Sequence, residues 1–276
     1  MKKQVITIII TCLVCLSSAV MAQGGNEFTI PLTDPAKRGK LKAHLNSGSI
    51  TVKGAARKDI LVRYKQEEDE DDDHDHDHDN KSNSKDGLKR VSGGGMDLEA
   101  AENDNYVVIK SDSWNNSINL EIEVPAGFDV EAHTYNDGDL MMTNLQGKLE
   151  LTNYNGEITA LNISGSVVAT TYNGEIKVTF DKVTDNTAMS YITYNGDVDL
   201  TLPATFKASM KMKTEQGEIY TGFDMNVVST GPKKVEDKNK GSFRIVIDDW
   251  KKGDINGGGA EVTVKTQNGD IYLRKK

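Results

Sequence analysis

A repeated turn motif containing Asn-Gly constrains the fold of this 276-residue chain more than any other feature of its sequence. Glycines recur every nine residues from Gly138 to Gly174, and alternate ones stand in a Tyr-Asn-Gly-Glu-Ile segment. Asn-Gly supplies the positive φ that a tight turn requires. The repeating unit therefore has eighteen residues and two turns. Related turns occur at residues 46–50, 194–198, 215–219 and 267–271.

The residues around these turns form columns that keep their chemical character from one repeat to the next. The position two residues after the glycine is aliphatic in every copy, namely Ile50, Leu149, Ile158, Val167, Ile176, Val198, Ile219 and Ile271. Aliphatic and polar residues alternate along each segment, which is typical of strands with one buried face. Constant columns are expected when each strand stacks on its equivalent in the next coil, about 4.8 Å away.

We therefore predict an all-β protein, a single-chain, β-helix-like β-solenoid of stacked coils of about 18–22 residues. An antiparallel β-sandwich is the main alternative, because it needs alternation and turns but no constant columns. The solenoid predicts that Ile158, Ile176 and Val198 line one shared interior column. A further inward column of threonines should bond one another or the turn backbone, and it consists of Thr171, Thr193, Thr214 and Thr266.

Two outward columns at the turns are candidates for ligand binding. A tyrosine precedes four of the turns, at Tyr135, Tyr154, Tyr172 and Tyr194, and an acidic residue follows the glycine at Asp139, Glu157, Glu175, Asp197, Glu218 and Asp270. Exposed tyrosines beside carboxylates and amides would suit sugar rings or a protein partner. The alternatives are an edge ladder that only stabilises the stack, and recruitment of Ca²⁺ by the carboxylates.

The chain divides into four segments by composition. Residues 1–22 have the basic start, short apolar stretch and small residue before a cut that are typical of a secretory signal peptide. Residues 23–65 form an opening β segment, residues 66–95 a disordered Asp/His-rich insertion, and residues 96–276 the solenoid repeats, which make one domain with 23–65. We expect residues 243–276 to close the fold. The protein should be exported to the periplasm or cell surface, or secreted, with no transmembrane segment in the mature chain.

The insertion dominates the charge of the protein. Residues 67–79 hold ten acids and no Lys or Arg, so the formal charge of −9 is almost entirely local. Nothing in the sequence favours a nucleic-acid partner. The alternation of Asp and His could bind a divalent metal such as Zn²⁺, Cu²⁺ or Ni²⁺, through His74, Asp75, His76, Asp77, His78 and Asp79. A solvated acidic loop is the simpler interpretation. We expect no other cofactor.

The sequence offers no catalytic apparatus. His44 and His133 are the histidines outside the insertion, and they are far apart in sequence. No Ser-His-Asp set, phosphate-binding glycine loop or helical metal pair is present. We therefore expect a protein that is not an enzyme, and a sugar-processing β-helix enzyme is the least favoured alternative.

These motifs resemble the bacterial “putative adhesin” family, a domain of unknown function. The resemblance rests on the Asn-Gly-Asp/Glu-Ile turns and on the segments 48–52, 87–90, 120–125 and 256–259. It implies a β-helix-like fold at the cell envelope and supplies no catalytic residues. We expect an adhesin-like binding or structural protein, whose partner is a glycan, an envelope protein or another copy of itself. The alternative is a periplasmic metal-buffering protein that uses the Asp/His residues.

Overall fold

The computed structural model describes residues 26–66, 97–114, 116–229 and 249–276, and also the backbone of four short strands outside these ranges. The described residues form strands and turns without any helix, so the predicted all-β class is confirmed. It follows that no described helix has the length and apolarity to cross a membrane. The predicted signal peptide and the Asp/His residues lie outside the described ranges.

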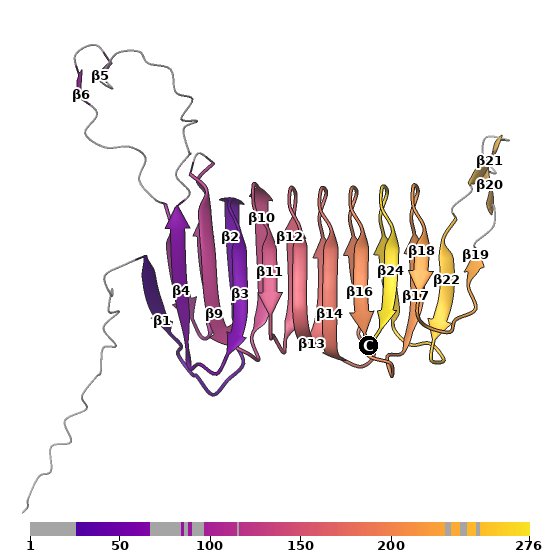
Figure 1. The fold of residues 1–276 in the computed structure, drawn as a ribbon, viewed down its shortest axis with the longest axis horizontal. Helices are drawn as coiled ribbons and strands as arrows, with labels where there is room; N and C mark the ends of the chain where they lie inside the picture. Colours follow the sequence, from indigo (N-terminus) through magenta and orange to yellow (C-terminus); the bar gives the residue numbers. More distant parts are fainter. Residues whose placement is uncertain are drawn as a thin grey trace, which may run out of the picture.

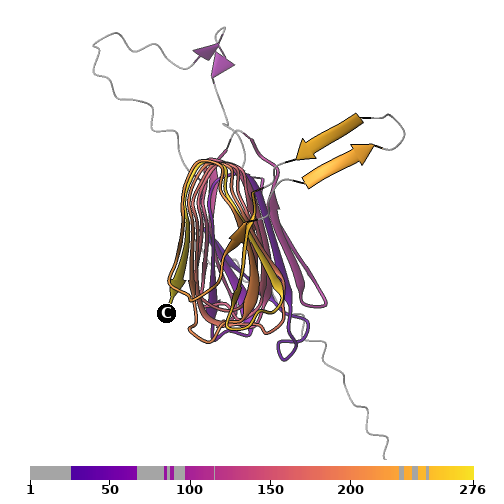
Figure 2. The same cartoon turned by 90° about the vertical axis from the view of Figure 1, so that its right-hand side faces the viewer.

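Two layers of parallel strands face each other and enclose a narrow core (Figure 2). The strands seen in Figure 1 form the first layer: β9 (Ile118–Pro125), β3 (Ile50–Ala55), β11 (Leu140–Thr143), the first half of β13 (Ile158–Thr170), β14 (Ile176–Val183), β16 (Val198–Leu202), β24 (Ile271–Lys275) and β18 (Ile219–Thr221). Because β13 also continues into the second layer, the layers join as one 20-stranded sheet.

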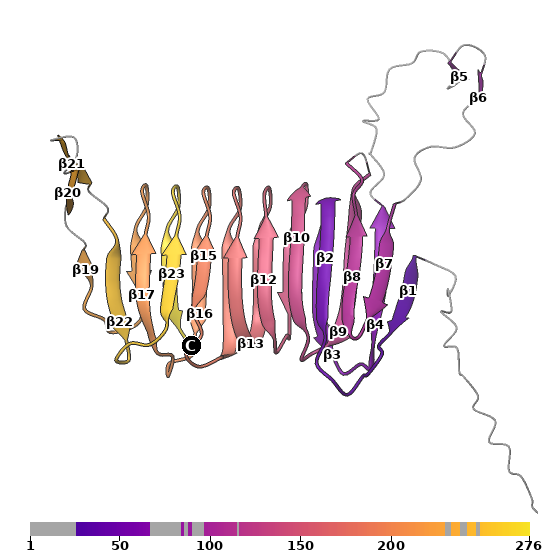
Figure 3. The ribbon, with the colours of Figure 1, turned by 180° about the vertical axis from the view of Figure 1, so that it is seen from behind.

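The opposite face carries the second layer (Figure 3). Its parallel strands are, in spatial order, β8 (Tyr106–Ser111), β2 (Lys40–Ser47), β10 (Asp129–Asn136), β12 (Lys148–Asn153), the second half of β13, β15 (Met189–Ile192), β23 (Glu261–Lys265) and β17 (Ala208–Lys213). Each strand of this layer leads through a turn into a strand of the first layer. The result is the solenoid-like arrangement that constant columns require.

Antiparallel strands cover the ends of the stack, which limits the exposure of unpaired backbone. At one end β4 (Asp59–Gln66) pairs with β9, β1 (Glu27–Pro31) with β4, and β7 (Glu99–Asn103) with β8. At the other end β22 (Lys251–Ile255) pairs with β17, and β19 (Val228–Ser229) with β22. Two further antiparallel pairs are β5 (Ser84–Lys85) with β6 (Leu88–Lys89), and β20 (Lys233–Asp237) with β21 (Ser242–Val246).

The interior columns form as predicted. Ile158 is in register with Ile176, and Ile176 with Val198, and all three side chains are fully buried. Their spacings of 18 and 22 residues along the chain match the repeat. Close stacking also explains the turn glycines, because a Cβ on Gly174 would lie 2.0 Å from the carbonyl oxygen of Gly156.

The coils do not stack in chain order, so the expectation that residues 243–276 close the fold holds for β22 but not for the last repeat. The last coil, β23 with β24, lies between the coil of β15 and β16 and the coil of β17 and β18. Figure 1 shows the yellow β24 between the orange β16 and β18. The opening coil of β2 and β3 is likewise inserted, between β8 and β9 on one side and β10 and β11 on the other. Strand β22, from the same closing segment, covers the far end together with β19.

Candidate functional site

The turns that lead from the second layer into the first lie along one long edge of the molecule, at the top of Figure 1. We call this edge, made by residues 135–139, 154–157, 172–175, 194–197, 267–270 and 215–218, the turn edge. Its apex is a chain of asparagine amides. Asn173 Nδ2 donates to Oδ1 of Asn155 at 2.7 Å, Asn195 to Asn173 at 2.6 Å, and Asn268 to Asn195 at 2.6 Å. These bonds tie each turn to its neighbour.

The threonine column supports the turn edge from inside, as predicted. Each hydroxyl donates to the carbonyl oxygen of the glycine in a neighbouring coil. Thr193 Oγ1 lies 2.9 Å from the oxygen of Gly174, and Thr266 Oγ1 lies 2.8 Å from that of Gly196. Thr171 and Thr214 make the same bond, at 3.0 and 2.8 Å. The threonines thus satisfy carbonyl groups that point into the core, where an unpaired acceptor would be costly.

The four tyrosines Tyr135, Tyr154, Tyr172 and Tyr194 form a continuous stack, which we call the tyrosine ladder. The ring centroids are 4.7, 5.1 and 4.7 Å apart, and neighbouring planes differ by 10° or less. Trp114 packs edge-on against Tyr135 at 5.4 Å and covers that end. The side chains are 37–41% exposed, as their outward parity predicted.

Stacking determines which parts of the rings a ligand can reach. The faces of the inner rings cover each other, so a sugar ring cannot lie flat on them. The phenol hydroxyls have no hydrogen-bond partner among the residues that the structure describes. The tyrosine ladder therefore presents ring edges and hydroxyl groups, spaced at the strand repeat of about 4.8 Å.

The acidic column runs along the other side of the same turns, and its aspartates help to hold the coils together. Asp139 Oδ1 accepts the backbone N–H of Glu157 at 2.8 Å. Asp197 accepts the N–H of Asp270 at 2.7 Å, and Asp270 accepts that of Glu218 at 2.8 Å. One oxygen of each aspartate is thus used structurally, whereas the glutamate carboxylates make no such bond between described residues.

No carboxylate of the acidic column makes a salt bridge to a described residue. The salt bridges of the described chain involve other carboxylates, such as those of Glu131, Glu123 and Asp199. Burial raises the pKa of Glu175, and the neighbouring carboxylates of Glu157, Asp199 and Asp197 raise it further, although Lys177 opposes them. The column is therefore a line of negative charge beside the tyrosine ladder, without salt bridges to described residues and partly countered at Glu175 by Lys177 and Arg274.

A second aromatic pair, which sequence reasoning missed, extends this surface onto the first layer. Tyr220 and Tyr272 stack at 5.2 Å, and their hydroxyls donate to Glu218 at 2.6 Å and Asp270 at 2.9 Å. The hydrogen bond to Glu218 raises the pKa of Tyr220 to about 12. The signal was present in the sequence, because both tyrosines stand two residues after the acid of their turn. This pair is separate from the tyrosine ladder, because Tyr272 lies on β24 of the first layer, whereas Tyr194 lies in the turn that follows β15 of the second layer.

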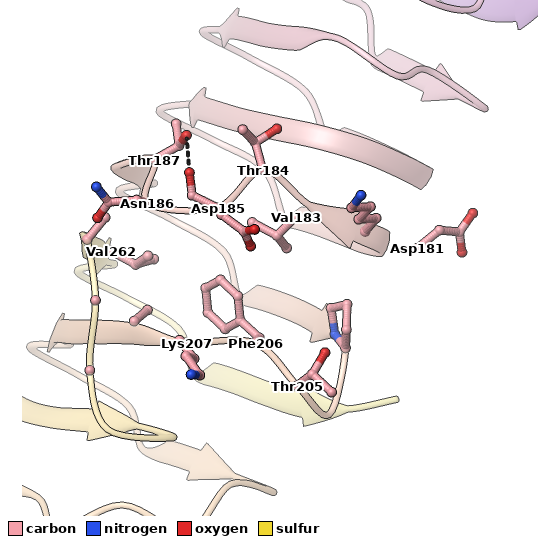
Figure 4. Close-up of a pocket in the computed structure, with 16 residues that line it drawn as sticks. Asp181, Val183, Thr184, Asp185, Asn186, Thr187, Thr205, Phe206, Lys207 and Val262 are labelled. Carbon is pink, nitrogen blue, oxygen red and sulfur yellow. Dashed lines mark hydrogen bonds between the residues drawn. The ribbon is translucent and has the colours of Figure 1, made fainter.

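A cavity of about 590 Å³ lies at the edge opposite the turns (Figure 4). It is lined by residues of the segments 181–187, 203–208 and 258–262. Phe206 and Val183 supply apolar surface, while Asp181 is engaged in an ion pair with Lys276 at 2.6 Å. No convergent set of polar groups marks this cavity for chemistry, so we regard the turn edge as the stronger candidate.

The predicted metal ligands His74 to Asp79 lie outside the described residues. Within the described ranges, no group of three or more His, Cys, Asp or Glu side chains is placed to hold a metal ion. The two remaining histidines, His44 and His133, are brought together by the inserted opening coil.

Comparison with known proteins places the chain in a family. The family described as Toastrack DUF4097 matches residues 17–274. Among solved structures, the chain is similar to a “putative cell adhesion protein” from Clostridium sporogenes ATCC 15579, with 13% identity, a TM-score of 0.41, and coverage of 91% of this chain and 99% of that chain. A search of curated proteins found no match. The family match covers nearly the whole chain and confirms the resemblance to a family of unknown function. The chain belongs to the Toastrack DUF4097 family.

Proposed function

We propose that this chain is an exported, non-enzymatic protein of the cell envelope that binds a partner through the turn edge. Residues 1–22 would direct export to the periplasm or cell surface. Coils of about 18–22 residues would act as a rigid support that spaces the contact groups at the strand repeat. The acidic insertion would be a separate, solvated segment.

One observation supports this proposal: a row of phenol hydroxyls runs beside a row of carboxylates. Within the described ranges, the hydroxyls of the tyrosine ladder have no hydrogen-bond partner, and the carboxylates have no ion-pair partner and accept only backbone N–H groups and the hydroxyls of Tyr220 and Tyr272. Functional groups that are exposed, regularly spaced and unsatisfied within the chain are those that a partner can satisfy. A basic segment of a protein fits best, because its ammonium or guanidinium groups would neutralise the carboxylates and its backbone would bond the hydroxyls. A neutral glycan is less suited, because the inner tyrosine faces cover each other.

A charge-neutralising variant tests the acidic column. The probe is a fluorescent oligo-lysine peptide, titrated against the full chain and against Glu157→Gln/Glu175→Gln. Two exposed ion pairs of about 0.5 kcal/mol each correspond to a loss of about fivefold in affinity. The matched control is Glu121→Gln/Glu261→Gln, which removes two exposed carboxylates away from the turn edge. An equal loss in the control would contradict the proposal.

A second variant separates binding from mere stacking. Tyr154→Phe/Tyr172→Phe/Tyr194→Phe keeps the ring stack and removes the hydroxyls. We expect thermal stability to change little, because these hydroxyls have no partner in the described chain. Photo-crosslinking in cells, from a benzoylphenylalanine at position 172, should yield adducts with a basic envelope protein, and Glu157→Gln/Glu175→Gln should reduce them. Adducts with glycan, with the chain itself, or insensitive to the two glutamates would refute a basic protein partner.

A further inference from the structure

His44 and His133 form a pair that the fold assembles from distant parts of the chain. They are 89 residues apart, yet they are register partners on the parallel strands β2 and β10. Their ring centroids are 4.8 Å apart, at an interplanar angle of 77°. Both side chains lie half-buried on the outer surface of the second layer, so they are open to small solutes.

The basic residues around this pair are each neutralised by a carboxylate. Lys42 Nζ lies 2.8 Å from Glu131, and Lys110, the register partner of His44, lies 3.1 Å from Glu99. The carboxylates therefore reduce the positive electrostatic potential that the lysines produce at the two imidazoles. On the other side, the register partner of His133 is the uncharged Thr152.

The side-chain amide of Asn46 determines which ring nitrogen of His44 carries the proton in the neutral form. The Nδ2 of Asn46 donates to the backbone oxygen of Asp112 at 2.8 Å, so the amide oxygen is the atom that faces His44. That oxygen lies 3.3 Å from Nε2 of His44. In the neutral ring Nε2 therefore carries the proton, and Nδ1 keeps its lone pair. His133 makes no hydrogen bond to any described residue, which leaves a ring nitrogen of its neutral form free as well.

We propose that His44 and His133 together bind a divalent transition metal ion, with Asn46 orienting the first ring. Two imidazoles side by side are a ligand set suited to Cu²⁺, Ni²⁺ or Zn²⁺, with Cu²⁺ preferred by the general order of affinities. Burial lowers the pKa of His133, and His44 and Lys42 lower it further against the opposing effect of Glu131, which favours the neutral form that can coordinate. The remaining coordination positions would be taken by water.

The test must separate this pair from the histidines of the acidic insertion. The reference protein is therefore the full chain carrying His74→Gln/His76→Gln/His78→Gln. Cu²⁺ alone is titrated into it by calorimetry, and electron paramagnetic resonance counts the coordinating nitrogens. We expect one ion per chain, with a signal from two imidazoles.

Single substitutions in the reference protein then assign the ligands. His44→Gln and His133→Gln should each weaken Cu²⁺ binding by at least about tenfold and reduce the signal to one imidazole. Asn46→Ala should weaken binding by about tenfold, as loss of an orienting hydrogen bond does elsewhere. Circular dichroism verifies that each variant is folded. Binding that is undetectable in the reference protein, or unchanged by either histidine substitution, would overturn the assignment.

Discussion

Replacing Thr193 with valine isolates the hydrogen bond that ties a coil to the turn of its neighbour. Thr193 is 3% exposed, and its hydroxyl donates to the carbonyl oxygen of Gly174 at 2.9 Å. Valine has nearly the same shape, so the packing is kept and the donor is lost. Because that carbonyl is then left without a partner, we expect a cost of about 1–3 kcal/mol in the free energy of unfolding. For a domain of this size the melting temperature should fall by roughly 2–10 °C.

Urea unfolding followed by circular dichroism measures this cost. The control is Thr179→Val, because Thr179 is a threonine of β14 that is partly exposed and makes no hydrogen bond to a described residue. The control should change stability by less than about 0.5 kcal/mol. The reasoning fails if Thr193→Val is as stable as the unmodified protein, or if both valine variants lose the same amount.

Other predictions concern packing and titration. Ile176→Ala should cost about 2–5 kcal/mol by chemical denaturation, because Ile176 is fully buried between two coils. The lowered pKa of His133 means that the unfolded chain binds a proton more readily, so stability should fall as the pH drops below 6.5, and His133→Gln should reduce this loss. The pKa of Tyr220 is raised to about 12, burial raises the pKa of Tyr191, and the hydrogen bond to Asp270 raises that of Tyr272, so ultraviolet titration should show a group of tyrosines that ionise late. Glu218→Gln should reduce this group by one, because it removes the negative charge that holds the proton on Tyr220. A pH profile unchanged by His133→Gln, or an equal number of late tyrosines in Glu218→Gln and the unmodified protein, would refute these two assignments.

The strands and their buried faces could be predicted from the sequence because the repeat makes them local properties. Alternation fixes which side chains point inward, and the turn glycine fixes the register, so the interior column of Ile158, Ile176 and Val198 followed directly. The inward threonines and the outward tyrosines followed from the same parity.

The order of the coils could not be predicted, because coils with equivalent columns can stack on one another in several ways. Ile271 packs in register with both Val198 and Ile219, and each of these aliphatic residues would also fit the other. The choice depends on connections and end strands that have no repeat pattern. The pairing of His44 with His133 depends on this order, so it could not be predicted from the sequence.

The surface chemistry of the tyrosine ladder was also only partly predictable. The column placed the four rings one above another, but ring rotation decides whether their faces or their edges are free. The structure shows planes within 10° of parallel at stacking distance, which covers the inner faces. Because of this geometry, we expect a basic protein segment that forms hydrogen bonds with the hydroxyls, rather than a sugar ring stacked on the tyrosines.

A disulfide experiment tests most directly whether the last coil is inserted between two earlier ones. Cysteines occur at positions 12 and 15, within the predicted signal peptide, so engineered pairs would stand alone in the mature chain. Asp199 is the register partner of Tyr272, whereas Tyr220 lies one strand further on. Asp199→Cys/Tyr272→Cys should oxidise to a disulfide, because neighbouring strands are about 4.8 Å apart. Asp199→Cys/Tyr220→Cys should stay reduced, since its Cα atoms would be about 10 Å apart. A disulfide in the second pair and none in the first would mean that the coils follow chain order, which contradicts this structure.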